Sequence, residues 1–171
     1  AGLWVRDSTA GIGTVTFYNP ETKVFAGLGH PVCDADNGEI LPLSTGQSAD
    51  VTINGVTKGQ AGDPGELIGS FVTGLPSGSL AINCRSGVYG LMDKCPVNSA
   101  GIPVAMRQEI KTGGAYILST VSGKTPKQYQ IVIEKIDLTD SADSRNMVIK
   151  ITDPELLNET GGIVQGMSGS P

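Results

Sequence analysis

Apolar and polar residues alternate in short runs along most of this chain, and Gly, Asn or Pro separates the runs. Residues 14–17 and 24–26 are strand-like and flank the turn-forming residues 19–22 (NPET), so they predict a hairpin. The second of these runs leads directly into residues 27–30 (GLGH). The only histidine of the chain, His30, is therefore expected where a strand ends.

Two Asn-Gly pairs predict further tight turns, because this dipeptide favours two-residue hairpin turns. One is Asn37-Gly38; the other is Asn54-Gly55, between the strand-like residues 51–53 and 56–57. Residues 59–90 are rich in Gly and Ser with brief apolar islands, which is typical of short strands joined by loops. Residues 104–110 fit either a strand or one helical turn, and the pattern does not decide between them.

The second half of the chain predicts three more strands and one helix. Residues 115–121 and 129–136 form a strand pair around 122–124, residues 138–145 are a polar surface loop, and 147–151 are a last strand. A capping residue, a Pro and a Glu then start a short helix at 153–155. Together these elements predict an all-β, mostly antiparallel domain of barrel or sandwich type.

Composition narrows the possible functions. The 171 residues fit one domain or two small packed ones, and 24 Gly and 10 Pro agree with many tight turns. The formal net charge is -5 and the 12 Lys and Arg are scattered, which argues against nucleic-acid binding. The apolar runs fall short of the about 20 residues of a membrane span, and we expect neither a span nor a signal peptide. Cys84 and Cys95 are spaced to close one loop, which would leave Cys33 over, and the cysteine pairing stays open.

The hexapeptide 166–171 (GMSGSP) carries the clearest chemical signal. A nucleophilic serine needs an exposed hydroxyl and backbone N–H groups directed at the developing oxyanion, and flanking glycines allow both. Ser168 is the candidate nucleophile, and the N–H groups of Gly166 and Ser168 are the candidate oxyanion hole. Ser170 is less suited, because it precedes Pro171 and lies outside the glycine pair. The hexapeptide is similar to the Gly-Asp-Ser-Gly-Gly-Pro signature of chymotrypsin-like peptidases, although a Gly- and Ser-rich segment is also common in plain loops.

His30 is the only imidazole that can serve as general base. A lone histidine is more often structural, but the order His then Ser is that of the chymotrypsin class. Asp153, fifteen residues before Ser168, is a candidate for the carboxylate that orients the imidazole. An Asp before Pro at a helix start is equally explained as a cap. The residues alone do not choose between Asp153 and its rivals, which are Asp34, Asp36, Asp93, Asp137, Asp140 and Asp143.

A metal site near His30 is rejected. Cys33, Asp34 and Asp36 lie close to His30 in the sequence, but their spacing does not match a calcium loop and no closing Glu is in register. A hairpin turn at Asn37-Gly38 explains these residues. We therefore expect no metal and no cofactor.

The sequence resembles the stage IV sporulation protein B peptidase family. The resemblance rests on residues 7–14 (DSTAGIGT), 18–22 (YNPET), 27–30 (GLGH) and 166–171 (GMSGSP), and it extends more weakly through the middle of the chain. It implies a serine endopeptidase with a chymotrypsin-like double β-barrel. Residue by residue, it implies that His30 is the base, Ser168 the nucleophile and Asp153 the acid.

The resemblance also implies a biological setting. Family members are exported from the forespore into the space between the forespore and mother-cell membranes, where they cleave themselves. They also cleave a membrane-protein inhibitor of an intramembrane metalloprotease, so that a mother-cell sigma factor is activated. A membrane anchor and a PDZ domain normally precede the peptidase domain. We expect residues 1–171 to form only the peptidase domain, as two packed sub-barrels with a boundary near 90–112, the second left incomplete after the nucleophile motif.

One hypothesis from another class remains beside the peptidase. A non-catalytic β-domain that binds a peptide or a membrane-protein partner would also fit the strand pattern. The position of His30 relative to Ser168 distinguishes the two, because a base and a nucleophile must lie within reach of each other.

Overall fold

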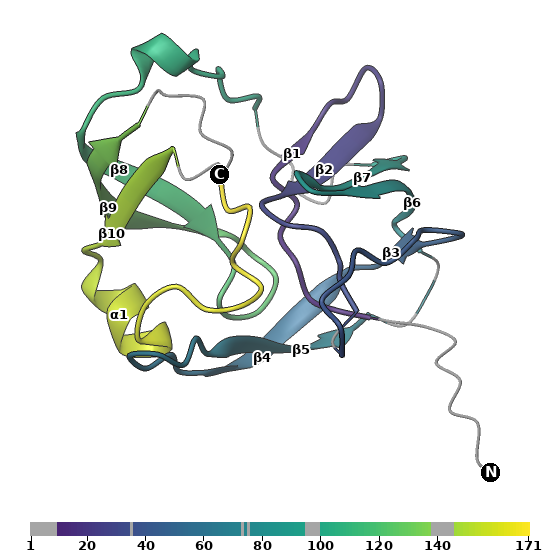
Figure 1. Cartoon of the computed structure of the whole chain (residues 1–171), viewed down its shortest axis with the longest axis horizontal. Helices are drawn as coiled ribbons and strands as arrows, with labels where there is room; N and C mark the ends of the chain where they lie inside the picture. The colour runs from purple at the N-terminus through teal and green to yellow at the C-terminus, as the bar shows by residue number, and fades with distance from the viewer. Residues whose placement is uncertain (1–9, 35, 73, 75, 95–99, 138–145) are drawn as a thin grey trace.

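The computed structural model describes residues 10–34, 36–72, 74, 76–94, 100–137 and 146–171. Within these residues β-strands dominate, accompanied by one α-helix and one 3-10 turn. The all-β prediction is confirmed. Figure 1 shows the strands gathered into two lobes, with the C-terminal segment running between them.

The first lobe is a five-stranded antiparallel sheet of strand order β1-β2-β7-β6-β3. The predicted hairpin is confirmed, because Asn19 Oδ1 accepts hydrogen bonds from the N–H groups of Glu21 and Thr22 in the turn between β1 and β2. Phe25 and Met92 are buried in this lobe. Its strands are β1 (Phe17–Tyr18), β2 (Val24–Leu28), β3 (Gln47–Ser48), β6 (Gly78–Cys84) and β7 (Gly87–Met92).

The second lobe contains a three-stranded antiparallel sheet of order β10-β9-β8, and the three predicted strands are confirmed. They are β8 (Gly113–Ser119), β9 (Lys127–Ile136) and β10 (Met147–Ile151). The predicted helix follows as α1 (Pro154–Thr160), and it ends at Gly161 with a left-handed φ of 74°. The undecided segment 104–110 contains a 3-10 turn, η1 (Arg107–Glu109).

The hairpin of β4 (Val51–Thr57) and β5 (Glu66–Phe71) corrects one prediction. Asn54-Gly55 does not reverse the chain. It lies inside a continuous β4, at a bulge between Ile53 and Gly55. A bulge places one extra residue in a strand and keeps its direction. The Asn54 side chain therefore points across the sheet, where its Nδ2 donates to Ser70 Oγ at 2.8 Å.

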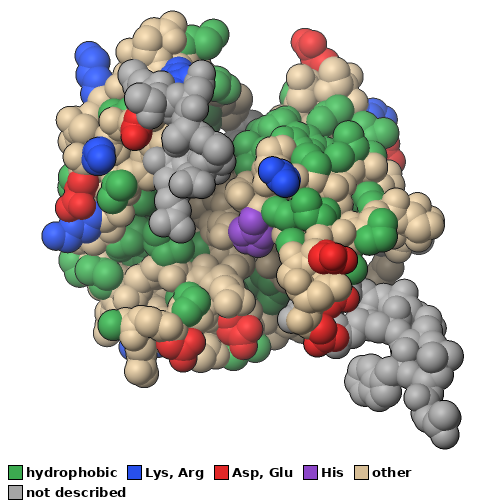
Figure 2. Space-filling model, in the orientation of Figure 1, with side chains coloured by type: hydrophobic (Ala, Val, Ile, Leu, Met, Phe, Trp, Pro, Cys, Tyr) green, Lys and Arg blue, Asp and Glu red, His purple; other side chains and the backbone are tan. Residues whose placement is uncertain are grey.

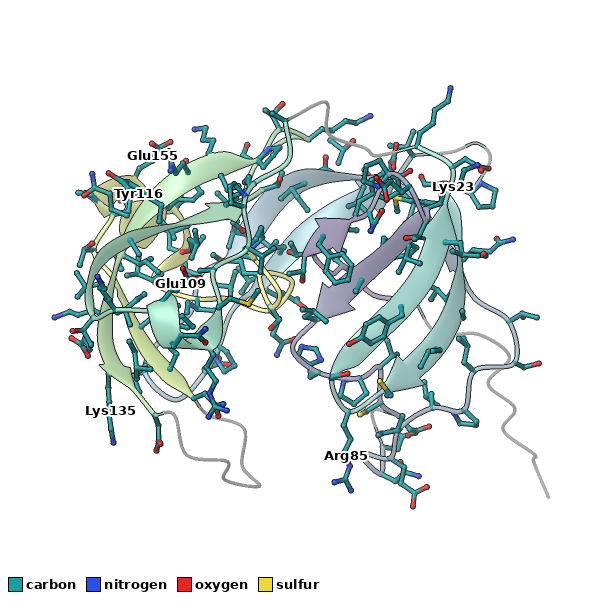
Figure 3. The ribbon with its side chains drawn as sticks, turned by 90° about the horizontal axis from the view of Figure 1, so that it is seen from above. Lys23, Arg85, Glu109, Tyr116, Lys135 and Glu155 are labelled. Carbon is teal, nitrogen blue, oxygen red and sulfur yellow. The ribbon has the colours of Figure 1, made fainter. Side chains whose placement is uncertain are left out.

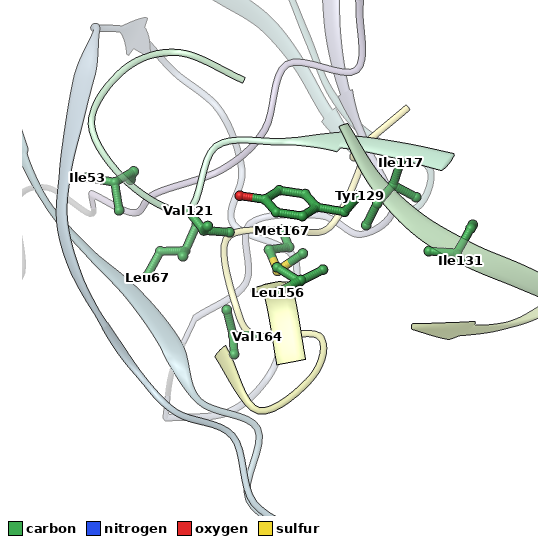
Figure 4. Close-up of a cluster of buried hydrophobic side chains, with 9 residues drawn as sticks. All are labelled: Ile53, Leu67, Ile117, Val121, Tyr129, Ile131, Leu156, Val164 and Met167. Carbon is green, nitrogen blue, oxygen red and sulfur yellow. The ribbon is translucent and has the colours of Figure 1, made fainter. Parts of the chain in front are cut away.

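Nine buried side chains form the core of the second lobe (Figure 4). They come from the β4–β5 hairpin, from β8, β9 and the loop between them, from α1, and from the C-terminal segment. This hairpin thus packs with elements that follow it far along the chain. The core residues are Ile53, Leu67, Ile117, Val121, Tyr129, Ile131, Leu156, Val164 and Met167.

The two lobes are distinct when seen from above (Figure 3), with Lys23 and Arg85 on the first and Tyr116, Lys135 and Glu155 on the second. The predicted sub-barrel boundary near 90–112 covers the end of β7 and the segment up to β8, and it stays a prediction. The predicted loop at 138–145 and Cys95, whose pairing with Cys84 was left open, lie outside the described residues. No described helix has the length and apolar character that a membrane crossing requires.

Candidate active site

Residues 166–171, here named the serine turn, fold into a tight glycine-dependent loop. Gly166 and Gly169 have left-handed φ values of 96° and 87°, which side-chain-bearing residues adopt only with strain. The Met167 N–H donates to the Val164 carbonyl at 3.2 Å, and the Ser170 N–H donates to the Met167 carbonyl at 3.0 Å. Met167 is buried in the core of the second lobe, whereas Ser168 stays half-buried at the surface. The methionine therefore anchors the turn and leaves the serine accessible.

The serine turn packs against the end of β2 in the first lobe. A Cβ atom at Gly169 would lie 2.6 Å from the Leu28 carbonyl oxygen, so only glycine fits there. A Cβ atom at Gly29 would lie 3.6 Å from Ser168 Cβ, which is ordinary van der Waals contact. The residue immediately before His30 thus lies beside Ser168. The fold thus brings the backbone next to His30 close to Ser168, although the two residues lie 138 positions apart in the sequence.

His30 is exposed at the exit of β2. Figure 2 shows the single histidine beside the hollow between the two lobes. Its Nδ1 lies 3.1 Å from the carbonyl oxygen of Pro31. A proton on Nδ1 would be donated to this carbonyl and would leave Nε2 with its lone pair free. That tautomer is the one that accepts a proton from a nucleophile.

The loop after His30 is fastened by Asn83 of β6. Asn83 Oδ1 accepts from the Val32 N–H at 2.9 Å, and Asn83 Nδ2 donates to the carbonyls of Val32 at 2.8 Å and Leu41 at 2.9 Å. One side chain thus satisfies three backbone groups of the loop that begins at the candidate base. Asn83 could not be singled out from the sequence, because an asparagine within a strand gives no local signal for a contact 51 residues away.

The N–H groups expected to form the oxyanion hole have no acceptor among the described residues. The Gly166 and Ser168 N–H groups make no hydrogen bond there, although the N–H groups of Met167 and Ser170 do. Unpaired, half-exposed donors on either side of Met167 are available to an incoming carbonyl oxygen.

Asp153 is the N-cap of α1, as its sequence context also predicted. Its carboxylate accepts from the Leu156 N–H at 3.1 Å and from the Gln130 N–H at 3.2 Å. These two backbone donors, the Leu156 N–H first, hold the pKa of Asp153 below its usual value. In the described part of the chain no hydrogen bond joins Asp153 to His30.

The rival serine is engaged in internal hydrogen bonds. Ser170 Oγ donates to the Met167 carbonyl at 2.7 Å and lies 3.2 Å from Ser119 Oγ, which is buried. A hydroxyl tied into its own turn is a poor nucleophile. The arrangement favours Ser168.

The acidic residues after His30 stabilise a turn. Asp34 Oδ1 accepts from the N–H of Asp36 at 2.8 Å and of Asn37 at 3.3 Å, and Gly38 has a φ of 73°. The turn predicted at Asn37-Gly38 is confirmed. The backbone of the turn thus satisfies the Asp34 carboxylate.

Comparison with known proteins decides the family. The chain matches the SpoIVB peptidase S55 family over residues 1–171. It belongs to this family. The SpoIVB-type domain is thus a serine peptidase with an all-β, chymotrypsin-like fold, and its substrates are proteins. No curated protein and no solved structure gives a significant match to the chain.

Proposed function

We propose that this SpoIVB-type domain cleaves peptide bonds with Ser168 as nucleophile and His30 as general base. The proximity of Gly29 to Ser168 carries the proposal, because the residue before the proposed base lies beside the proposed nucleophile. The half-exposed Ser168 and the free N–H groups of Gly166 and Ser168 support it further.

The reaction follows from these groups. Ser168 Oγ attacks the scissile carbonyl carbon while His30 Nε2 takes the hydroxyl proton. The N–H groups of Gly166 and Ser168 stabilise the oxyanion of the tetrahedral intermediate. The protonated imidazole then gives its proton to the leaving amine, which leaves an acyl-enzyme. A water molecule, deprotonated by His30, hydrolyses the acyl-enzyme and restores the serine.

Asp153 is the proposed acid of the triad, on the strength of the family resemblance. A carboxylate has about four acceptor sites, so the two backbone bonds of Asp153 leave capacity for an imidazole N–H. The role requires the Nδ1 proton of His30 to be shared with this carboxylate in place of the Pro31 carbonyl during catalysis.

We propose further that the domain acts in sporulation signalling, in the space between the forespore and mother-cell membranes. Its substrates there are itself and a membrane-protein inhibitor of an intramembrane metalloprotease. The family membership supports this setting.

Cleavage of the inhibitor's extracytoplasmic segment tests the proposed substrate. The purified protein is incubated with that segment, and the products are identified by mass spectrometry with Ser168→Ala as control. A discrete cut that Ser168→Ala abolishes supports the proposal. Self-cleavage without any cut in the inhibitor would overturn the proposed partner and leave the chemistry intact. Capture of the inhibitor by a folded protein that labels with no serine reagent would favour the non-catalytic hypothesis.

A further inference from the structure

The segment before β1 reaches the serine turn through one hydroxyl group. Thr14 Oγ1 donates to the Gly166 carbonyl oxygen at 2.7 Å, in a half-buried contact between residues 152 positions apart. It is the one side chain from outside the serine turn that donates a hydrogen bond to a backbone carbonyl of the turn, among the residues that the structure describes.

With the Thr14 hydrogen bond, both polar groups of the Gly166–Met167 peptide are hydrogen-bonded. The carbonyl of the Gly166–Met167 peptide is held by Thr14, and its N–H is held by the Val164 carbonyl at 3.2 Å. Rotation of this peptide would break both hydrogen bonds. A glycine on its N-terminal side offers little steric resistance to such a rotation, and Gly166 already has a φ of 96°. The hydrogen bonds, rather than sterics, therefore set the plane of the peptide.

The orientation of this peptide matters for the oxyanion. The N–H groups of Gly166 and Ser168 belong to the peptides on either side of it, so a change in ψ of Gly166 or φ of Met167 that the other angle does not compensate would move them relative to each other. Oxyanion stabilisation depends on donors that are placed before the charge develops.

Thr14 itself is held firmly. Ile12 packs against the core of the second lobe. Thr16 is bound to β2 of the first lobe, since its N–H donates to the Ala26 carbonyl at 2.7 Å and its Oγ1 accepts from the Leu28 N–H at 2.9 Å. Thr14 thus lies between two fixed residues, Ile12 on the second lobe and Thr16 on the first.

We propose that Thr14 is a positioning residue for catalysis, whose hydroxyl fixes the Gly166–Met167 peptide and thereby the oxyanion hole. It touches neither the substrate nor the reacting atoms. The inference rests on the proposed role of Ser168 as nucleophile.

Two pairs of variants isolate the hydroxyl. Thr14→Val replaces it with a methyl group of similar size, and Thr14→Ala and Thr14→Ser differ from each other by the hydroxyl alone. Thr57→Val is the matched control, because Thr57 is exposed in β4 and its hydroxyl makes no hydrogen bond among the described residues. Peptide cleavage and the rate of fluorophosphonate labelling at Ser168 are measured well below the melting temperature of each variant.

We expect Thr14→Val and Thr14→Ala to lower kcat and the labelling rate roughly 10- to 100-fold, less than the loss of a whole oxyanion donor. KM should change little, and Thr14→Ser and Thr57→Val should stay close to the wild type. If Thr14→Val and Thr14→Ala lost activity through a general loss of structure, Thr14→Ser would not keep the activity of the wild type.

Wild-type labelling rates in folded Thr14→Val or Thr14→Ala would overturn the inference. Should Thr14→Val fail to fold, the Ala and Ser pair decides. A wild-type protein that is active but labels elsewhere than Ser168 would instead overturn the proposed nucleophile.

Discussion

Gly29 lies beside Ser168 at the junction of the two lobes, since a Cβ atom added at Gly29 would lie 3.6 Å from Ser168 Cβ. The end of β2 delivers His30 and the serine turn delivers the hydroxyl. The proposed site is therefore divided between the two lobes. Catalysis in this domain should therefore depend on groups that keep the serine turn against β2.

Gly169→Ala should separate the serine turn from β2. Its Cβ would lie 2.6 Å from the Leu28 carbonyl oxygen and 2.7 Å from Thr16 Oγ1, and both the clash and the φ of 87° oppose the substitution. We expect cleavage to be lost and the free energy of unfolding to fall by more than about 2 kcal/mol. Peptide-cleavage assays and urea unfolding measure the two effects.

Gly123→Ala is the matched control for Gly169→Ala. Gly123 also has a left-handed φ, of 68°, but nothing lies within 4 Å of the added Cβ. We expect a loss of about 1 kcal/mol with activity retained. Equal effects of the two substitutions on activity would show that contact with β2 is not required.

Asn83→Ala should loosen the loop that begins at His30. The substitution removes two exposed hydrogen bonds to Val32 and one half-buried hydrogen bond to Leu41, so we expect a loss of about 1 kcal/mol and an activity lowered roughly 10-fold. Hydrogen exchange at residues 32–41 should become faster. Asn54→Ala, which removes one exposed bond to Ser70, should leave both activity and this exchange unchanged. Unaltered exchange at 32–41 in Asn83→Ala would refute the fastening role.

Several elements could be predicted from the sequence because their causes are local. The turn at residues 19–22 and the capped start of α1 depend on residues a few positions apart. Asn54-Gly55 has equally local turn chemistry, but β4 pairs with β5 on both sides of it, so the dipeptide forms a bulge and not a turn. The dipeptide alone does not indicate that β5 will pair with the residues on both sides of it.

In the candidate site, too, features with local causes could be predicted and contacts between distant residues could not. The glycines around Ser168 and the position of His30 after a strand were visible in the sequence, and the family resemblance joined them. The hydrogen bonds of Thr14 to Gly166 and of Asn83 to Val32 connect distant segments, and only the folded chain reveals them. Asp153 was ambiguous from the start, because a helix cap and a triad acid require the same residue type.

Asp153→Asn distinguishes these two roles. Asparagine caps a helix nearly as well as aspartate, so α1 should persist. If the carboxylate orients His30, kcat should fall by about 10⁴-fold, because an amide favours the wrong imidazole tautomer. Asp137→Asn should have little effect on kcat. Asp153→Asn with kcat within about tenfold of wild type and intact circular dichroism would show that Asp153 is a cap alone.

The acid stability of the domain should also reflect Asp153. Backbone N–H groups of Leu156 and Gln130 lower its pKa in the folded state relative to the unfolded chain. The ionised carboxylate therefore stabilises the folded state above its ordinary pKa of about 3.9, and this stabilisation disappears as the pH falls through the lower folded-state pKa. Urea unfolding at several pH values should show the wild type losing its advantage over Asp153→Asn on acidification. An advantage that stays constant from neutral to strongly acidic pH would contradict the assignment.

The most direct test of the central claim is fluorophosphonate labelling of the purified protein, followed by peptide mass mapping. We expect one label, on Ser168, that persists in Ser170→Ala and disappears in Ser168→Ala. His30→Ala should lower the labelling rate by several orders of magnitude, because the serine loses its base. A label on Ser170, or a label on Ser168 whose rate does not depend on His30, would contradict the proposed pair of base and nucleophile.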